Sequence, residues 1–287
     1  MAAADEPAID PVTIGDLTAS HLPAAVALST AVGWPHRMED WAFVHALGHG
    51  LAAEAEGALV GTALGWEFGP AVGTLGMVIT APPMQGLGIG RRMLNRVLQQ
   101  LGPRTVILHA TEAGMPLYRS LGFVSDGIVV THQHGPVATG PKPLHEERIR
   151  AAGPCDFTAL AALDRAATGM QRLHVIRALQ PVSNLVVLDR GGEAVGFAIR
   201  RRFGLGHVIG PVVAPDAASA RALIGHLLAP CAGGVVRIDV PAHCDLSPWL
   251  ASIGLPETGR VVRMVRGPAP ATGSMATCFA LISQALN

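Results

Sequence analysis

An internal repeat constrains the fold of this chain more than any other feature of its sequence. Each half carries the same order of predicted segments: strand, strand, helix, strand, short helix and strand. The two opening strands read LVGTALGWEF and GTLGMVITAP in the first half, and AVGFAIRRRF and GHVIGPVVAP in the second. Self-similarity of this kind marks repeated structural units, so the sequence predicts two domains that share one fold. The later matching segments are 105–110, 116–123 and 127–133 in the first half and 235–240, 247–255 and 260–267 in the second.

Strands that alternate with helices place each half in the α/β (or α+β) class, built on a mixed sheet. The length of 287 residues agrees with two domains of about 150 residues each. The segment 135–143 is rich in proline and glycine, so it is predicted to connect the two copies. We therefore expect a first domain at 1–135, a linker at 136–145 and a second domain at 146–287. A final strand of the second sheet is expected at 277–283.

Composition and charge exclude several classes of protein. Hydrophobic residues make up 49% of the chain and charged residues 15%, and 21 basic side chains balance 21 acidic ones. Such a chain is too apolar for a disordered protein, and its net charge of zero argues against an electrostatically driven nucleic-acid partner. The four cysteines form no C-x-x-C pair, which predicts neither a disulfide framework nor a zinc site.

The beginning of the sequence, MAAADEPAID, is acidic and lacks the basic and apolar regions of a signal peptide. The longest uncharged run, 68–90, is interrupted by prolines and glycines, which argues against a membrane helix. From these features we expect a cytoplasmic protein that binds neither a membrane nor a metal.

A glycine-rich turn joins a strand to a helix at residues 85–90. It reads QGLGIG, follows a β-branched strand that Pro82 ends, and precedes a helix whose apolar residues recur at i+4 steps. Glycines at a helix start leave the backbone N–H groups open and the helix dipole favours an anion there, so a pyrophosphate is the expected ligand. A dinucleotide fingerprint would need a third glycine where Arg91 stands, and a nucleotide-triphosphate loop would need a lysine. The spacing that fits is Q-x-x-G-x-G; the alternative is a turn that merely packs the helix closely on the sheet.

These residues resemble the signature of the GNAT acyltransferase superfamily, [R/Q]-x-x-G-x-[G/A], which Gln85, Gly88 and Gly90 match. A second block of that family, the strand ILHAT followed by GMPLYRSLGF (114–123), is matched as well. The resemblance covers residues 10–135, and the second half is similar to a GNAT-type domain by topology alone. It implies tandem GNAT-like acyl-CoA N-acyltransferase folds.

The resemblance also implies acetyl-CoA as acyl donor, with its pantetheine along the strand before the turn and its pyrophosphate on the amides of the turn. Thr111 stands where the family often carries an asparagine, and its hydroxyl can serve in the same place. The cofactor-binding residues implied are Met77, Val78, Ile79, Gln85, Gly86, Leu87, Gly88, Ile89, Gly90, Arg91 and Thr111.

Acyl transfer from a thioester to an amine needs a polarised carbonyl and a proton for the leaving thiolate. An N–H of Val78 or Ile79 is the expected oxyanion donor. Tyr118, the only tyrosine of the chain, matches the usual general acid of the family. Its reference pKa of about 10, against about 8.5 for a thiol, keeps it protonated at neutral pH. The alternative for Tyr118 is an amphipathic residue at a helix–sheet contact.

A base is needed only if the bound amine stays charged. His109 and Glu112, which flank Thr111, are the leading candidates, and Glu67 and Asp239 are two more. Each is as readily explained as a cap, a surface charge or a hydrogen-bonded core group, and ordered water can replace any of them.

The second half lacks the glycine turn. On the repeat, Ala218 stands opposite Gln85, and Arg221 and Leu223 stand opposite the two signature glycines. Side chains of this size would fill the space in which backbone meets phosphate. The second domain is therefore expected to be a degenerate copy that walls the acceptor pocket, or a structural partner that covers the edge of the first sheet.

The leading functional hypothesis is an acetyl-CoA-dependent N-acetyltransferase that acts on the amine of a small molecule by direct attack on the thioester. The alternative is a non-catalytic acyl-CoA-binding or sensing protein. Acetylation of proteins is disfavoured because no charged docking surface is evident in the sequence. The sequence does not determine the oligomeric state, and a homodimer is the candidate that we consider.

Overall fold

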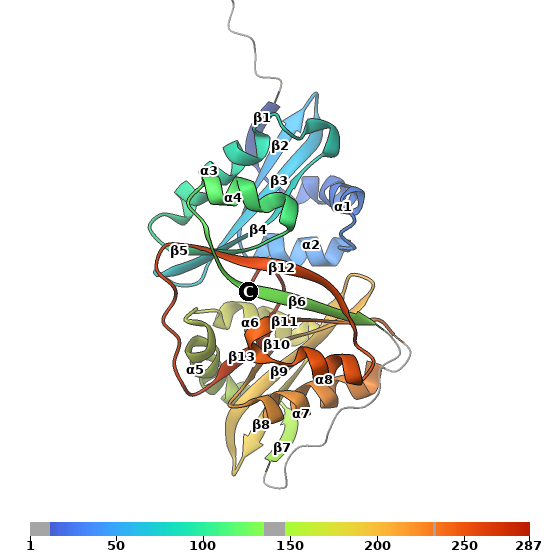
Figure 1. Cartoon of the computed structure of the whole chain (residues 1–287), viewed down its shortest axis with the longest axis vertical. Coiled ribbons are helices and arrows are strands. Elements are labelled where there is room, and N and C mark those ends of the chain that lie inside the picture. The colour runs from blue at the N-terminus through green and yellow to red at the C-terminus, as the bar shows by residue number, and fades with distance from the viewer. Residues whose placement is uncertain (1–11, 135–146, 232–233) are drawn as a thin grey trace, which may run out of the picture. The chain divides into compact units, whose positions relative to one another are not determined.

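The structure, a computed structural model, describes residues 12–134, 147–231 and 234–287 (Figure 1). It divides the chain into two compact units that do not follow the repeat. Unit 1 contains Met1–Gly65 and Met77–Gln100, and unit 2 contains Trp66–Gly76 and Leu101–Asn287. The division at 1–135 and 146–287 stays a prediction based on the repeat, and the predicted linker at 136–145 lies outside the described residues.

Unit 1 is built on a sheet with the strand order β1-β2-β3-β4, in which β1–β2 and β2–β3 are antiparallel. Glu56 and Gly57 form the turn between β2 and β3 with φ of +51° and +77°, which is the geometry of a tight two-residue hairpin. β3, β4 and α3 each begin in one unit and end in the other. The bounds are β1 (Val12–Asp16), α1 (Leu22–Ala31), α2 (Met38–Ala46), β2 (His49–Ala55), β3 (Ala58–Glu67), β4 (Val72–Thr80) and α3 (Ile89–Leu101).

The predicted apolar stripe of α3 is buried. Ile89, Met93, Val97 and Leu101 are each at most 2% exposed, as expected for one face of a helix that covers a sheet. Gly61 on β3 provides the room for this contact, because a Cβ there would lie 2.9 Å from the Met93 methyl carbon. The helix that follows the glycine turn is therefore held firmly against the sheet.

The strand order in unit 2 is β4-β5-β12-β6-β11-β10-β9-β8-β7, with β13 on β10. The pairs β4–β5 and β10–β11 are parallel and the others are antiparallel, so the sheet is mixed. The bounds are β5 (Thr105–Ala110), α4 (Met115–Ser120), β6 (Val124–His134), β7 (Glu147–Ala151), α5 (Phe157–Thr168), α6 (Leu173–Leu179), β8 (Ser183–Arg190), β9 (Glu193–Phe203), β10 (Gly206–Ala214), α7 (Ala217–Leu228), β11 (Val236–Pro241), α8 (Ser247–Ser252), β12 (Glu257–Arg266) and β13 (Thr277–Ala280).

The last strand of each repeat lies in the sheet of the other repeat (Figure 1). β12 pairs with β5 in the register Val262↔Ala110, and β6 pairs with β11 in the register Ile238↔His132. The two exchanged strands also pair with each other, which makes the strand order symmetric about the contact between β6 and β12. Val130 of β6 consequently belongs to the hydrophobic core of the second repeat.

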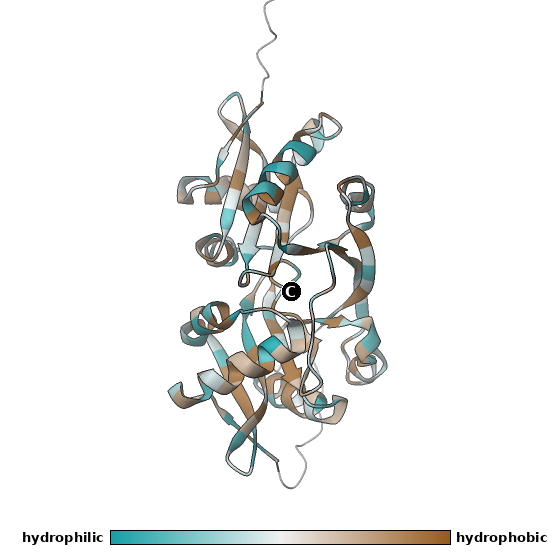
Figure 2. Ribbon diagram, turned by 90° about the vertical axis from the view of Figure 1, so that its left-hand side faces the viewer, coloured by the Kyte–Doolittle hydropathy of each residue, from teal (hydrophilic) through white to brown (hydrophobic). Residues whose placement is uncertain are grey.

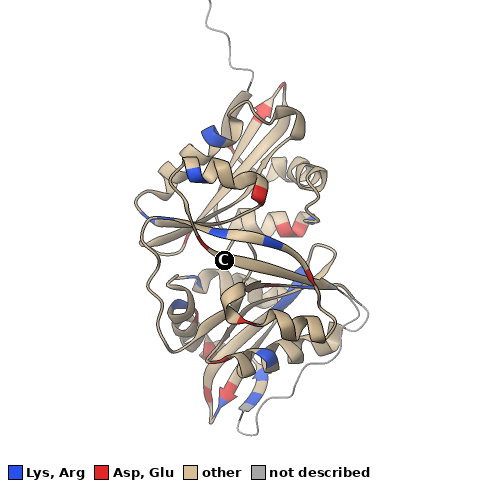
Figure 3. Cartoon of the chain, in the orientation of Figure 1, with Lys and Arg blue, Asp and Glu red and all other residues tan. Residues whose placement is uncertain are grey.

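Apolar residues line the strands and the faces of the helices that cover them (Figure 2). Charged residues are scattered over both repeats in the described part of the chain rather than gathered on one element (Figure 3). None of the helices within 12–134, 147–231 and 234–287 has the length and apolarity that a membrane crossing needs.

Candidate active site

The glycine turn is open to solvent. Gln85, Gly86, Leu87 and Gly88 are all exposed. Gly86 and Gly88 have φ of +82° and +76°, a backbone conformation that residues with a side chain rarely adopt. A Cβ added to either glycine would meet no atom within 4 Å. These glycines are thus required by the backbone conformation and not by close packing of the helix on the sheet.

The first N–H groups of α3 directly follow this open turn. The Arg92 amide donates to the Gly88 carbonyl at 3.0 Å, which is the first main-chain bond of the helix. The amides of Ile89 and Gly90 precede that bond, so the helix itself offers them no acceptor. The Gln85 side chain donates to the Thr80 carbonyl at 3.1 Å and ties the turn to the end of β4. Together with the helix dipole, these groups form a site suited to an anion such as a pyrophosphate.

β4 carries an irregularity at Met77. Its φ of +51° is unusual for a residue with a side chain, and the buried hydroxyl of Thr62 donates to its carbonyl at 2.7 Å. The parallel ladder with β5 involves only Val72, Gly73 and Thr74 of β4 in the described residues. The part of β4 that contains Val78 and Ile79 therefore has main-chain groups that the pairing with β5 does not use.

Tyr118 lies on α4 and is only 9% exposed. Its ring packs edge-to-face on Phe123 at a centroid distance of 6.0 Å. A Cβ on Gly114 would lie 2.9 Å from the tyrosine ring, so this contact needs glycine. Burial raises the pKa of Tyr118 to about 12. The hydroxyl consequently stays protonated at neutral pH and can donate.

His109 lies on β5 with one ring nitrogen bonded and the other buried without a partner. Nδ1 lies 2.8 Å from the Gln284 carbonyl, and since a carbonyl can only accept, Nδ1 must carry the hydrogen. Nε2 is then the unprotonated nitrogen, and it has no hydrogen-bond partner in the described structure. Burial lowers the pKa of His109 to about 4, and the nearby charge of Arg263 adds to this effect. The imidazole is therefore neutral at pH 7 with a lone pair on Nε2.

Two further predicted residues follow β5. Thr111 is the N-cap residue of the short 3-10 helix at Glu112–Gly114, and both Thr111 and Glu112 are exposed. Glu67 and Asp239 are held by arginines instead, with Arg104 at 2.6 Å from Glu67 and Arg237 at 3.0 Å from Asp239. The structure thus leaves His109 and Glu112 as the predicted bases without an ion pair among the described residues.

The segment after β13 was not recognised in the sequence as part of this region. The Gln284 side chain donates to Thr131 and to Asp239 at 3.1 and 3.2 Å, which fixes the carbonyl that His109 contacts. Thr74 donates to the Ala285 carbonyl at 2.8 Å. No local sequence signal marks this segment, because its role arises from contacts with residues more than 40 positions away.

Two positions of the second repeat differ from the first at the helix start and on the preceding strand. Asp216 caps α7 by accepting from the Ser219 amide at 2.8 Å, so a side-chain anion of the protein already occupies that helix start. Aligning the repeated Ala-Pro pairs places Pro211, which has no N–H, opposite Val78. β10 pairs with β11 only at His207 and Val208, and β13 pairs with β10 further along, at Val212–Ala214.

Solved structures of other proteins share the fold of this chain over nearly its whole length. A protein from Pyrococcus horikoshii superposes with a TM-score of 0.80 at 20% identity, covering 99% of this chain and 98% of that chain. A tandem GNAT protein from the clavulanic acid biosynthesis pathway superposes with a TM-score of 0.65 at 13% identity, covering 90% of this chain and 99% of that chain. The mixed α/β architecture is therefore that of tandem GNAT proteins.

Sequence comparison identifies the family. The model of the acetyltransferase (GNAT) family matches residues 21–123, and that of an acetyltransferase (GNAT) domain matches residues 160–280. The uncharacterized N-acetyltransferase YitH of Bacillus subtilis (strain 168) is 31% identical over 219 residues, which cover 75% of this chain and 76% of the relative. The chain belongs to the GNAT family and is a two-domain N-acetyltransferase.

Proposed function

We propose that this N-acetyltransferase uses acetyl-CoA to acetylate the amine of a small molecule by direct attack on the thioester. The observation that carries the proposal is the exposed turn at Gly86 and Gly88, whose conformation presents the start of α3 to an anion. Members of the family use acetyl-CoA in general, and the pyrophosphate of CoA fits such a turn. The residues assigned to it are Gln85, Gly86, Leu87, Gly88, Ile89, Gly90 and Arg91.

In this mechanism β4 receives the thioester arm. Met77, Val78 and Ile79 offer main-chain groups to the pantetheine, and an N–H of Val78 or Ile79 stabilises the negative charge on the carbonyl oxygen when the amine attacks. The unusual backbone conformation of Met77, whose carbonyl accepts from Thr62, supports this part of the proposal. Thr111 supplies a hydroxyl at the end of β5.

Tyr118 is the proton donor in the proposal. The amine nitrogen bonds to the carbonyl carbon, and collapse of the tetrahedral intermediate breaks the bond to sulfur. Tyr118, whose raised pKa keeps its hydroxyl protonated at neutral pH, then protonates the thiolate, and the resulting phenolate regains a proton from the solvent. The proton lost by the amine passes to Nε2 of His109, to Glu112 or to water. Nε2 accepts a hydrogen bond readily, but the low pKa of His109 makes it a relay rather than a proton store.

The balance of charges favours a small acceptor over a nucleic acid. A cytoplasmic location and a homodimer remain part of the prediction. Within the described residues, no group of three His, Cys, Asp or Glu side chains is arranged to hold a metal ion. We propose the reaction without a metal.

The proposal is tested by measuring release of the CoA thiol from acetyl-CoA in the presence of a panel of amines. The panel contains amino acids, polyamines and aminoglycosides. Turnover with any of these amines supports the proposal. Saturable binding of acetyl-CoA without turnover across the panel would instead identify a sensing protein, and absence of binding would refute the assignment of the glycine turn.

A further inference from the structure

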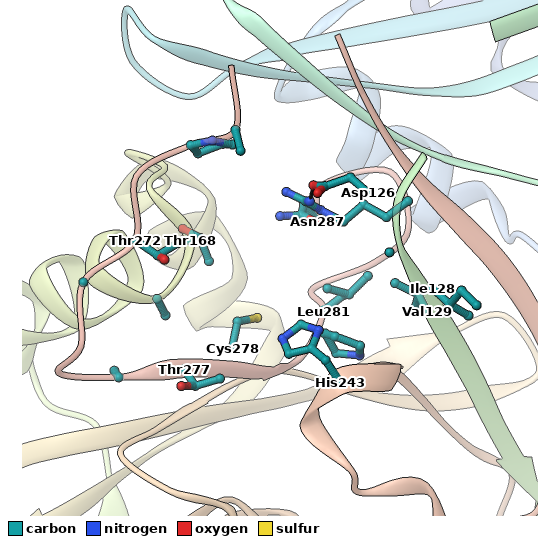
Figure 4. Close-up of a pocket in the computed structure, with 18 residues that line it drawn as sticks. Asp126, Ile128, Val129, Thr168, His243, Thr272, Thr277, Cys278, Leu281 and Asn287 are labelled. Atoms are coloured by element: carbon teal, nitrogen blue, oxygen red, sulfur yellow. Dashed lines mark ion pairs between the residues drawn. The ribbon is translucent and has the colours of Figure 1, made fainter. Parts of the chain in front are cut away.

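A cavity of about 460 Å³ lies within unit 2 and has no role in the proposed reaction (Figure 4). Its volume is within the usual range of small-molecule sites. Strands β6 and β12 contribute to one wall, and the segment between β12 and β13 contributes to another. A polar and an apolar part can be distinguished among its lining residues.

The polar part contains an ion pair. Asp126 of β6 and Arg263 of β12 form a salt bridge, and their side chains keep 34% and 24% of their surface exposed. Both residues line the cavity, so each charge can also face a ligand. Burial lowers the pKa of Arg263, which means that its cation is poorly solvated and gains from an added anion.

Asn287 adds an unsatisfied acceptor. Its side chain lines the same cavity and the residue is only 7% exposed. The amide nitrogen lies 3.9 Å from the sulfur of Met170, whereas Oδ1 is buried without a hydrogen-bond partner in the described structure. In the view of Figure 4, Asp126 and Asn287 are drawn at one end of the cavity and Thr277 at the other. A buried acceptor of this kind costs free energy unless a donor satisfies it.

We propose that this cavity binds a small zwitterion, a molecule that carries one ammonium and one carboxylate group, as a free amino acid does. The ammonium group donates to Asp126 and to Oδ1 of Asn287, and the carboxylate accepts from Arg263. Ile128, Val129 and Leu281 line the cavity beside these groups and accommodate an apolar side chain.

The charge balance of the wall selects against other ions. A diamine would place its second cation near Arg263, and a dicarboxylate would place its second anion near Asp126. In a zwitterion each charge meets its opposite, so the ligand separates the pair without leaving either charge unpaired. This inference does not depend on acetyl transfer.

The test is calorimetric titration of the full chain without acetyl-CoA at pH 7. The probes are the twenty amino acids, followed by three analogues of the tightest binder and by 1,4-diaminobutane. The analogues are the amide, which lacks the carboxylate, the N-acetyl derivative, which lacks the ammonium, and the N-acetyl amide, which lacks both. We expect an amino acid to bind and each singly altered analogue to bind at least about tenfold more weakly, as expected for loss of a charge-assisted hydrogen bond.

Variants locate the site. Asp126→Asn is expected to weaken binding at least about tenfold, and Asn287→Ala several-fold. The matched control is Glu257→Gln, which removes an exposed carboxylate paired with Arg260 on the same strand, β12, and should leave binding unchanged. The double variant Asp126→Asn with Arg263→Gln removes both charges, so a loss of binding there cannot reflect one charge left unpaired.

Three results would overturn the inference. In the first, no amino acid binds at about 10 mmol per litre, a concentration on the order of the weakest affinity of interest. In the second, 1,4-diaminobutane binds as tightly as the tightest amino acid. In the third, Asp126→Asn binds that amino acid with the parental affinity. None of these results bears on acetyl-CoA turnover, so failure here is distinguishable from failure of the proposed reaction.

Discussion

The helices that follow the central strand of each repeat, α3 and α7, begin in opposite ways. α3 begins at an exposed turn that contains two glycines with positive φ. α7 begins at Asp216, whose carboxylate bonds to the Ser219 amide. The start of the helix thus follows an exposed turn in one repeat and is capped by a carboxylate of the chain itself in the other.

Three other repeat positions differ in the same direction. Pro211 has no N–H at the position where Val78 has one, and Leu250 stands at the position of Tyr118 in the short helices α8 and α4. Among the described residues, Nε2 of His109 has no hydrogen-bond partner, whereas Asp239, its counterpart on β11, is bonded to arginine, threonine and glutamine side chains. The first copy therefore retains polar groups at positions where the second copy has proline, leucine or a hydrogen-bonded carboxylate.

The largest expected effect is on catalysis. Tyr118→Phe should lower kcat about 100-fold or more, because general acid catalysis contributes factors of this size. The affinity for acetyl-CoA should change less than about twofold, since the ring and its contact with Phe123 are kept. Steady-state kinetics and calorimetric titration measure the two quantities separately.

Leu250→Ala is the matching change in the second repeat. It should destabilise the protein by about 3 kcal/mol because Leu250 is fully buried, while kcat of the folded protein stays near the parent value. A Tyr118→Phe enzyme with parental kcat would contradict the assigned difference between the repeats.

The next effect concerns pH. Burial lowers the pKa of folded His109 to about 4, while the unfolded chain has an ordinary histidine pKa. Stability from this residue is complete above about pH 6.5 and is lost as pH falls toward 4, because the unfolded state binds the proton first. We expect a loss of about 3 kcal/mol by pH 4 that is absent in His109→Asn.

Unfolding by urea across pH 4 to 7.5 measures this loss. His49→Asn serves as the control because His49 is exposed, and it should keep the parental pH dependence. Identical pH dependence in His109→Asn and the parent would show that the unpartnered nitrogen has no energetic consequence.

A smaller effect is expected at the turn itself. Gly88→Val should raise KM for acetyl-CoA about tenfold or more, because it strains the backbone at positive φ and places methyl groups beside the amides that we propose to bind the pyrophosphate. Gly57→Val is the matched control: Gly57 has the same sign of φ and open space around it, but lies in the hairpin between β2 and β3. Both variants should lose a similar amount of folding stability. An equal rise of KM in both would contradict the proposal that the turn at Gly88 binds acetyl-CoA.

The smallest effect is expected at the capped helix. Asp216→Ala should cost about 1 kcal/mol of stability through loss of the cap, and Asp216→Asn should recover most of it. Titration should give one acetyl-CoA per chain in the parent and in both variants. A second bound acetyl-CoA in the parent would mean that the second repeat is not degenerate.

The local features of the site could be read from the sequence because each depends on neighbouring residues. The turn at Gly86 and Gly88 and the helix after it follow from glycine content and apolar period. The block around Tyr118 is likewise contiguous in sequence. The partners of His109 could not be read, since Gln284 lies 175 positions away and reaches it only through the fold.

The repeat, the order of its segments within 59–133 and 194–267, the glycine turn of one copy and its loss in the other follow from the sequence alone. These properties are local, because they depend on hydrophobic period and on glycine and proline positions. Only the tertiary structure decided that β6 and β12 exchange sheets, that β13 covers the edge of β10 and that the compact units cut across the repeat. Apolar strands can pair with more than one neighbour, so the choice among distant partners is made by the packing of the whole core.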